Sequence, residues 1–470
     1  MGVRAQENHV RPELARDLGL SHAGAVVVGT IIGSGIFLVP SEMMQAVGTA
    51  RLVYLAWMAG GLLSFFGALT YAELGAMKPQ AGGEYVYVRD AYGPLAGFLY
   101  SWATFLIAKP ASIATITTGL VRILGTFPVF SFFSQRIFSH AFSHSSVAHP
   151  FTLTYGQMVA IGAAVLISWL NYIGVRRAGD FQFLFTLLKV AIILGIVTVG
   201  FSYSGGTWTN FATEFAGAKG GMAGFFAALV AALWAYDGWN DLNMVAGEIR
   251  NPQRNIPLSL IWGVATVGAL YILVNAAVQY VLPAAAVAGS ERPASDAVAM
   301  VLGRAGAGLV SAGMAVSMLA TLNGSVMSGA RVPFAMARDV YFFKAMAEVH
   351  PRFHTPSVAI ILQCGLSIIL LLLGGSFRQF FSLAIFAEWM FYMITGSTVF
   401  VFRRREPDAE RPYRVCGYPV VPAVFVMVSA ALLYYTFTDN LKSSAAGCMA
   451  ILAGVPVFYF FARHRAATPK

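Results

Sequence analysis

Three small residues, Gly33, Ser34 and Gly35, interrupt an apolar run that extends from Val26 to Pro40. Glycine and serine weaken a helix, and a helix that breaks in its middle leaves backbone N–H and C=O groups without intrahelical partners. Inside a bilayer such groups are tolerated where they line a cavity or bind something, so this segment predicts a site for a charged solute. The alternative is a close contact between two helices through small residues.

A second interruption lies in the other half of the chain. The apolar run that begins at Met222 is broken by four polar or flexible residues, Asp237, Gly238, Asn240 and Asp241. Two interrupted spans in corresponding halves of a chain are the sequence pattern that best indicates a transporter binding site. Together, the two stretches favour a solute site over simple helix packing.

The composition of the chain predicts an integral membrane protein. Of its 470 residues, 57% are hydrophobic and 11% are charged, and its mean hydropathy is +0.68, whereas about 25% of the residues of soluble proteins are charged. At about 20 residues per span, the length predicts roughly twelve transmembrane helices and no separate soluble domain. The net charge of +10 does not indicate nucleic acid, because the basic residues form short clusters between apolar runs.

The polar start of the chain has no apolar segment followed by a small-residue cleavage site, so we expect no signal peptide. Most lysine and arginine residues fall in loops on the side of the N-terminus, which predicts a multi-pass protein of the cell (inner) membrane with both termini in the cytoplasm. The predicted spans are 21–47, 52–77, 94–124, 153–173, 181–203, 222–247, 258–282, 305–327, 357–374, 380–402, 420–437 and 444–461. The two interrupted spans are five apart and therefore opposite in orientation, as an inverted repeat requires.

The sequence indicates neither a metal, a cofactor nor an enzyme. His140 and His144 have a helical spacing that suits a metal, but their surroundings offer no further ligand. Cys364, Cys416 and Cys448 have no metal spacing or pairing pattern, so we expect free thiols. The chain also lacks the H-E-x-x-H, P-loop and G-x-S-x-G motifs, and no span has the continuous polar stripe of a channel.

Four stretches resemble the amino acid-polyamine-organocation superfamily: G-T-I-I-G-S-G-I-F at 29–37, Y-A-E-L-G at 71–75, A-Y-D-G-W-N at 235–240 and N-P-Q-R-N-I-P at 251–257. Their order and spacing are most similar to the L-type amino acid transporter branch, the light chains of heteromeric exchangers and their bacterial relatives. The resemblance implies an all-α integral membrane fold with twelve transmembrane helices and a LeuT-type five-plus-five inverted repeat, in which helices 1 and 6 are broken. Residues 1–470 would form one transporter domain with a tail (1–20), two repeats (21–203 and 222–402) and two further helices (420–461).

The resemblance also bears on partners. Animal light chains carry a cysteine between helices 3 and 4 that bonds a glycoprotein, and residues 125–150 contain none. We therefore expect no disulfide-linked heavy chain. The expected partners are an amino acid substrate and membrane lipid.

An amino acid needs hydrogen-bond donors for its carboxylate and acceptors for its ammonium. The amides of Ser34, Gly35 and Ile36, next to Gly33, would begin a half-helix whose positive dipole end suits a carboxylate. The resemblance implies that three carbonyl groups accept from the ammonium, those of Ile31, Trp234 and Asp237.

Two of these residues have further expected roles. The resemblance gives Trp234 the role of a lid over the substrate, the alternative being a core aromatic residue. Many neutral exchangers have a small residue in place of Asp237, so cationic amino acids enter the predicted substrate range.

Charged residues inside predicted spans are costly and by default functional. The resemblance places Lys189 where sodium-coupled relatives hold sodium, so its ammonium could replace the ion; alternatively it carries a coupled proton or reaches the membrane interface. Glu388 could read substrate charge, relay a proton or pair with a neighbouring helix. Lys109 is predicted to be structural or lipid-facing.

Polar residues elsewhere have simpler expected roles. Asn275, Ser317 and Asn323 are predicted to form hydrogen bonds between helices. Arg16, Asp17 and Glu248 are expected near the inner mouth, where ion pairs could close a gate.

The sequence as a whole predicts a sodium-independent amino acid transporter that works by alternating access. An exchanger of neutral and also cationic L-amino acids is the favoured form. The alternative is a proton-coupled symporter.

Overall fold

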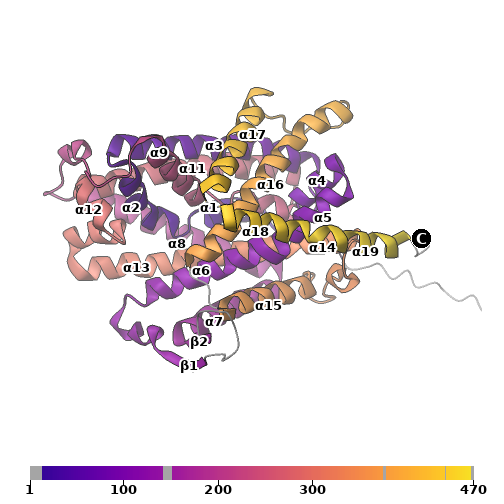
Figure 1. Cartoon of the computed structure of the whole chain (residues 1–470), viewed down its shortest axis with the longest axis horizontal. Coiled ribbons are helices and arrows are strands. Elements are labelled where there is room, and N and C mark those ends of the chain that lie inside the picture. Colours follow the sequence, from indigo (N-terminus) through magenta and orange to yellow (C-terminus); the bar gives the residue numbers. More distant parts are fainter. Residues whose placement is uncertain (1–12, 141–150, 374–376, 440, 467–470) are drawn as a thin grey trace, which may run out of the picture.

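In the computed structural model the chain is a bundle of long apolar helices (Figure 1), described over residues 13–140, 151–373, 377–439 and 441–466. Within these residues, eight helical segments are long and apolar enough to cross a membrane, and two shorter apolar helices, Gly221–Ala235 and Ser357–Leu373, accompany them. The long helices run side by side, with α12 (Ala284–Gly289) at one end of the bundle and α4 (Glu84–Tyr92) at the other. The predicted helical membrane architecture is confirmed at this level.

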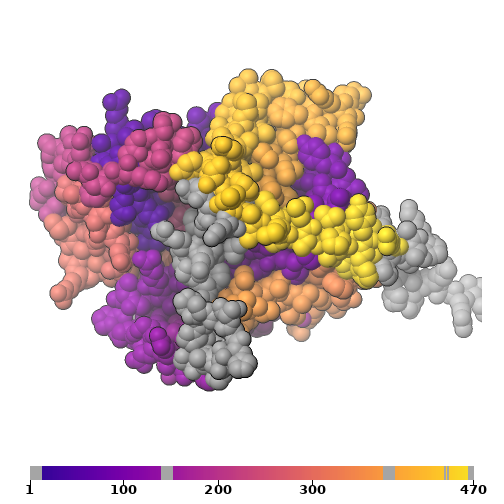
Figure 2. Space-filling model, viewed as in Figure 1, coloured from indigo at the N-terminus to yellow at the C-terminus, as the bar shows by residue number. Residues whose placement is uncertain are grey.

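The helices of the first half are α1 (Leu20–Ile31), α2 (Gly35–Val47), α3 (Ala50–Met77), α4, α5 (Pro94–Ala103), α6 (Lys109–Leu124), α7 (Tyr155–Tyr172) and α8 (Val175–Phe201). Those of the second half are α9 (Gly221–Ala235), α10 (Asp241–Met244), α11 (Pro252–Val281), α12, α13 (Pro293–Gly329), α14 (Arg331–Arg338), α15 (Ser357–Leu373), α16 (Phe377–Arg405), α17 (Val420–Asp439), α18 (Leu441–Leu452) and α19 (Gly454–Ala466). A π-helical turn, Thr104–Ala108, joins α5 to α6. Helices α17 to α19 lie on the outer surface of the face seen in Figure 2.

Both interruptions that the sequence predicts are present as gaps between helices. Helix α1 ends before Ile32, whose φ of −71° and ψ of 84° are not helical, and α2 begins at Gly35. Helix α9 ends at Ala235, and the turn before α10 contains Gly238 with φ of +103°. Glycine adopts this conformation at little cost. A Cβ at Gly238 would also lie 3.1 Å from Thr30, so glycine permits both the turn and the contact between the two gaps.

Three features differ from the prediction. Strands β1 (Arg136–His140) and β2 (Phe151–Thr154) pair antiparallel between α6 and α7, where the sequence predicts an outer loop and the start of the next span; both strands contain aromatic and β-branched residues, which favour strands. Helix α13 begins before the predicted span at 305–327 and has a non-helical Gly303 with φ of 67°. The last predicted span is divided into α18 and α19.

A buried ion pair joins α14 to the segment after α10. Arg331 donates from Nε and Nη2 to the two carboxylate oxygens of Glu248, at 2.7 and 2.9 Å, and both side chains are 0% exposed. The Glu248 carboxylate is therefore engaged by Arg331 and makes no ion pair with Arg16, which also lies within the described residues. Asp17 instead accepts from Arg250 at 3.1 Å, and Arg16 contributes its carbonyl oxygen to the same guanidinium.

Replacing Arg331 with methionine should lower the stability of the folded protein. The substitution leaves the Glu248 carboxylate buried without its cation, which costs about 3–5 kcal/mol in comparable pairs. The measurement is the apparent melting midpoint of purified protein in detergent, followed by size-exclusion chromatography. Arg338→Met, on the exposed side of the same helix, is the matched control and should melt close to wild type; equal losses in both variants would contradict the prediction. The double variant Arg331→Met/Glu248→Leu should recover part of the loss.

Candidate functional site

A cavity of about 90 Å³ lies where the two interrupted segments meet. Seven of the predicted site residues line it: Ile31, Gly33, Ser34, Gly35, Trp234, Asp237 and Glu388. Ile36 is 1% exposed and lies outside the lining, as does Lys189 at 0%. Polar residues that the sequence reasoning did not assign to a site complete the wall: Thr30, Lys109, Ser112, Thr115, Asp241, Thr321 and Ser325.

The start of α2 forms one side of the cavity. Gly35 is its first residue. The amides of Phe37 and Leu38 donate to the Ser34 carbonyl. Those of Gly35 and Ile36 stand at the start of the helix, where no intrahelical acceptor precedes them. Ser34 makes no side-chain capping bond to them. Because Ser34 and Gly35 line the cavity, the positive end of the α2 dipole is available to an anionic group there.

Carbonyl groups at the ends of α1 and α9 share one donor. The Tyr271 hydroxyl of α11 lies 3.0 Å from the Ile31 carbonyl oxygen and 2.8 Å from that of Ala235. Thr30 adds a hydrogen bond of 2.7 Å to the Gly238 carbonyl. Sequence reasoning missed Tyr271, whose available signal was a tyrosine inside an apolar span. The Ile31 carbonyl, predicted to accept from an ammonium, thus already has a donor from the protein.

Gly35 also takes part in a close helix contact through small residues, which was the alternative that the sequence left open. A Cβ at Gly35 would lie 2.9 Å from both Cα and Cβ of Ala235. The backbones of α2 and α9 approach each other at this point because neither residue has a large side chain. The Gly-Ser-Gly segment therefore combines an unwound stretch at Ile32 to Ser34 with a packing contact at Gly35.

The opposite wall of the cavity carries an ion pair. The Lys109 ammonium of α6 contacts the Asp241 carboxylate of α10, and the two residues are 5% and 3% exposed. Lys109 was predicted to be structural or lipid-facing. The lipid-facing alternative is wrong, because its apolar stem leads inward and its ammonium reaches Asp241, 132 residues further along the chain.

Acidic groups outnumber basic ones around the cavity. Asp237 and Glu388 line it together with Asp241, and Lys109 is the cation among its lining residues. The Tyr392 hydroxyl donates to Asp237 Oδ1 at 2.6 Å. This surplus of carboxylates suits a ligand with a positive group, and Glu388 lies where it could contact the ligand.

Lys189 lies beside the cavity, held by oxygen atoms on two helices. Its Nζ is 2.7 Å from the Gly29 carbonyl oxygen and 2.6 Å from that of Ile32, both at the end of α1. On α13 it contacts the Ser317 carbonyl at 3.0 Å and the Thr321 hydroxyl at 3.4 Å. The ammonium satisfies carbonyl groups that the break in α1 leaves free, and the predicted alternative in which Lys189 reaches the interface is wrong.

Two of the three predicted polar contacts between helices are present. Ser317 donates to the Ile32 carbonyl at 2.8 Å. Asn323 bonds Asn171 of α7 at 2.9 Å and Gln182 of α8 at 2.8 Å. Asn275 instead donates within its own helix, to the Tyr271 carbonyl at 2.7 Å.

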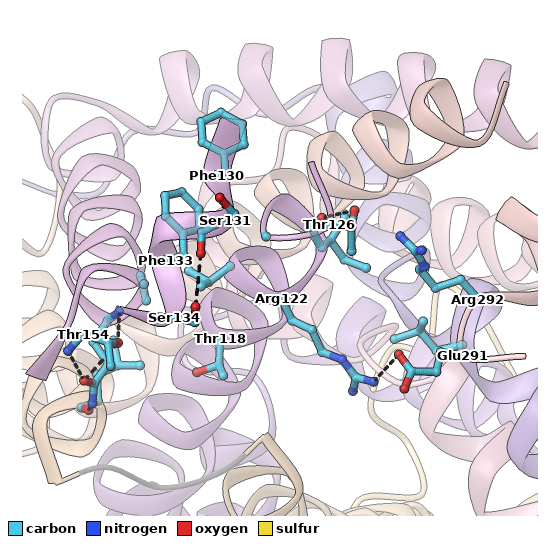
Figure 3. Close-up of a pocket in the computed structure, with 18 residues that line it drawn as sticks. Thr118, Arg122, Thr126, Phe130, Ser131, Phe133, Ser134, Thr154, Glu291 and Arg292 are labelled. Carbon is cyan, nitrogen blue, oxygen red and sulfur yellow. Dashed lines mark hydrogen bonds and ion pairs between the residues drawn. The ribbon is translucent and has the colours of Figure 1, made fainter. Parts of the chain in front are cut away.

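A second cavity of about 440 Å³ opens at the α12 end of the bundle (Figure 3). Figure 3 shows Arg122 of α6 directed at Glu291, with Arg292 on the same side; the nearest atoms of Arg122 and Glu291 are 3.6 Å apart. Leu38, one turn beyond Gly35 on α2, lines the cavity. Helix α2 thus contributes to both cavities, and the larger one lies on the α12 side of the smaller.

The structure describes the three cysteines but not the side chains of the two histidines that were considered as metal ligands. The side chains of His140 and His144 lie outside the described residues. Cys364, Cys416 and Cys448 are free. Within the part of the chain that the structure describes, no group of three or more His, Cys, Asp or Glu side chains could hold a metal.

An apolar helical bundle with a small polar cavity between two unwound segments is the architecture of a membrane transport protein. The chain belongs to the amino acid permease family, which matches residues 18–459. This confirms the resemblance found in the sequence, and the protein is a transporter of amino acids rather than an enzyme.

Three relatives show the breadth of the family. The chain is 32% identical over 459 residues to the serine/threonine exchanger SteT of Bacillus subtilis, covering 97% of this chain and 98% of that protein. It is 31% identical to the b(0,+)-type amino acid transporter 1 of Homo sapiens, covering 96% of this chain and 88% of that protein. It is 30% identical to the Asc-type amino acid transporter 1 of Mus musculus, covering 96% of this chain and 82% of that protein.

Replacing Lys189 with alanine should abolish transport while the protein stays folded in the membrane. The change removes the donor that satisfies the free carbonyls of α1 and joins this helix to α13. The measurement is uptake of labelled amino acid into liposomes, with size-exclusion chromatography as the test of folding. Thr198→Val, at an exposed position of the same helix, should transport normally. Near-normal uptake by Lys189→Ala would exclude the residue from the mechanism.

Proposed function

We propose that the protein is a sodium-independent exchanger of L-amino acids that works by alternating access across the cell membrane. The observation that carries the proposal is the cavity formed by the two unwound segments. Its α2 side offers free amides for a carboxylate, and its other side offers carboxylate groups for an ammonium. A zwitterionic amino acid matches this polarity at both of its charged groups.

The size and charge of the cavity narrow the substrate. A volume of about 90 Å³ is well below the roughly 300–1,000 Å³ of pockets for drug-sized ligands, which supports small amino acids. The name of the serine/threonine exchanger SteT points in the same direction. Asp237 supports the inclusion of cationic substrates, and the b(0,+)-type and Asc-type relatives are named as amino acid transporters. Trp234, in the cavity wall, is proposed as the lid.

Sodium independence rests on Lys189. Three carbonyls and one hydroxyl converge on its ammonium, a set of oxygen ligands that would also suit a metal cation. The fixed positive charge of Lys189 would hold these oxygen atoms of α1 and α13 together, as a bound sodium ion would. The alternative from the sequence, in which Lys189 or Glu388 carries a coupled proton, defines the rival symporter.

The proposed architecture has twelve transmembrane helices with an inverted repeat over 21–203 and 222–402. The concentration of lysine and arginine in loops at the α4 end supports a cytoplasmic location for that end. No disulfide-linked heavy chain is proposed, because residues 125–150 contain no cysteine. The protein would thus act in the cell membrane without such a partner.

Transport into liposomes separates the exchanger from the symporter. Labelled L-serine uptake is measured with empty or serine-loaded vesicles, with and without sodium, and with and without an inward proton gradient. Uptake that requires internal amino acid and that neither ion gradient drives supports the exchanger. Uptake into empty vesicles that follows the proton gradient would establish the symporter instead.

Asp237→Asn should slow the exchange of every substrate, because this carboxylate faces the α-ammonium. It should also reduce exchange of lysine relative to leucine by about tenfold, since lysine carries a second ammonium and a charge-assisted hydrogen bond contributes about 1.5–3 kcal/mol. Asparagine keeps the size of the side chain but removes its charge. The measurement is the ratio of lysine to leucine exchange in loaded liposomes. Asp180→Asn, at an exposed position, should leave the ratio unchanged. An unaltered ratio in Asp237→Asn would mean that this carboxylate does not read substrate charge.

A further inference from the structure

Glu84 is a buried acid for which the proposed transport cycle has no role. It is the first residue of α4, outside the membrane-spanning helices, and it is 1% exposed. Its carboxylate accepts hydrogen bonds from two neutral groups, Asn240 Nδ2 at 2.7 Å and the Tyr100 hydroxyl at 3.1 Å. Burying a carboxylate among neutral partners is costly, so its position calls for an explanation.

A continuous set of hydrogen bonds links Glu84 to the substrate cavity. Asn240 donates to Glu84 through Nδ2 and accepts from the Tyr392 hydroxyl through Oδ1, at 2.8 Å. The same hydroxyl lies 2.6 Å from Asp237 Oδ1. Asp237 lines the cavity. A change in the protonation state of Glu84 can therefore alter the hydrogen bonding of Asp237 through two intervening side chains.

A small chamber provides a second connection. It has a volume of about 20 Å³, which is room for about one water molecule. Its lining includes Glu84, Tyr100, Asn240, Lys109 and Glu388. Lys109 and Glu388 also line the substrate cavity. Lys109 and Glu388 thus form a wall between Glu84 and the substrate.

We propose that Glu84 is a proton-binding site linked to the substrate site, so that a proton on Glu84 and a substrate ammonium at Asp237 oppose each other. The proposal rests on the proposed function in one respect: it takes the ammonium to bind at Asp237. It adds a second ligand, the proton, and a second site, outside the substrate cavity.

The linkage follows from the donors and acceptors along the path. When Glu84 is ionised it accepts from Asn240, and the single Tyr392 proton is shared between Asn240 and Asp237. When a proton from solvent binds Glu84, the new O–H donates to the Asn240 oxygen after the amide turns over. The amide N–H then donates to the Tyr392 oxygen, which commits the Tyr392 proton to Asp237 and reduces the capacity of Asp237 to accept from a substrate.

Electrostatics act in the same direction. An ionised Glu84 adds negative charge near the cavity and strengthens the attraction for an ammonium, whereas a neutral Glu84 does not. Substrate should therefore bind more tightly when Glu84 is ionised. By reciprocity, binding of substrate should release a proton from Glu84.

The surroundings of Glu84 set the pH at which this occurs. The titratable and charged groups around it are Tyr71 of α3, Tyr87 of α4, Tyr100 of α5, Lys109 of α6 with its partner Asp241 of α10, and Glu388 and Tyr392 of α16. Burial raises the pKa of Glu84 to about 7, against the hydrogen bond from Asn240 and the attraction of Lys109, which lower it. The carboxyl is therefore mostly protonated below this pH and mostly ionised above it.

Titration calorimetry of purified protein with L-serine tests the linkage directly. At about pH 7, the binding enthalpy of wild type should differ between two buffers of different ionisation enthalpy, because protons are released. From about pH 8 to about pH 6 the Kd should rise by about fivefold, a typical coupling between two sites. In Glu84→Gln, which mimics the protonated form, the buffer dependence should vanish and the Kd should stay at its high value throughout.

Two further variants keep the test decisive. Asp90→Asn alters another acid of α4, one that pairs with Lys78 and Arg89, and should keep the behaviour of wild type. Tyr392→Phe retains Glu84 but interrupts the path, so it should reduce the pH dependence even if Glu84→Gln does not fold. Unchanged proton release in Glu84→Gln, or unchanged pH dependence in Tyr392→Phe, would overturn the proposal.

The outcomes separate this proposal from the proposed function. If wild type binds and exchanges amino acids but releases no proton and shows a flat pH profile, the proton site fails and the exchanger stands. If wild type binds no amino acid at any pH, the proposed function itself fails.

Discussion

Backbone polar groups inside an apolar bundle must find partners, and this constraint organises the site. The gap between α1 and α2 frees carbonyls at one side and amides at the other. The carbonyls of Gly29, Ile31 and Ile32 already receive donors from Lys189, Tyr271 and other side chains. The amides at the start of α2 have no capping side chain at Ser34. The protein thus fills one side of the gap itself and leaves the other for the ligand.

This asymmetry changes how the two ends of an amino acid are recognised. In the binding mode that we propose, the carboxylate would meet open amides. The ammonium would meet the Ile31 carbonyl, which already has a donor, so side-chain carboxylates gain importance. Asp237, Asp241 and Glu388 supply them, and Lys109 keeps Asp241 partly neutralised. We therefore infer that the preference of the site for substrate charge depends on a balance among these four side chains rather than on Asp237 alone.

The sequence predicts those parts of the site that are local in the chain. Gly33 to Gly35 and Asp237 interrupt apolar runs, and such interruptions are visible without any knowledge of the fold. Lys109 and Tyr271 were not assigned to the site because their hydrogen-bond partners are distant in the sequence. The partner of Lys109 is 132 residues away, and the Ile31 carbonyl is 240 residues from Tyr271. Glu84 lies between the predicted spans 52–77 and 94–124, and nothing in its neighbourhood predicts burial beside Asn240. Strands β1 and β2 were not predicted because each is short and its pairing partner lies beyond residues 141–150.

Hydrogen bonds between the two broken helices join segments that are far apart in the sequence. Near the α4 end, the Leu18 amide donates to the Glu248 carbonyl at 3.0 Å, and the Arg250 amide donates to the Leu18 carbonyl at 2.8 Å. In the middle of the bundle Thr30 bonds the Gly238 carbonyl. Helix α1 and the α10 segment are therefore joined at both ends of their shared length.

On the α12 side, α2 and α9 are instead joined through Gly35 and Ala235. The cavity lies between these two joined pairs. Alternating access requires the protein to open one side of the site while the other stays closed. Under the proposed mechanism, the two linked pairs would supply this division. The gaps at Ile32 to Ser34 and around Gly238 are unwound, so one pair could turn against the other there without breaking a helix.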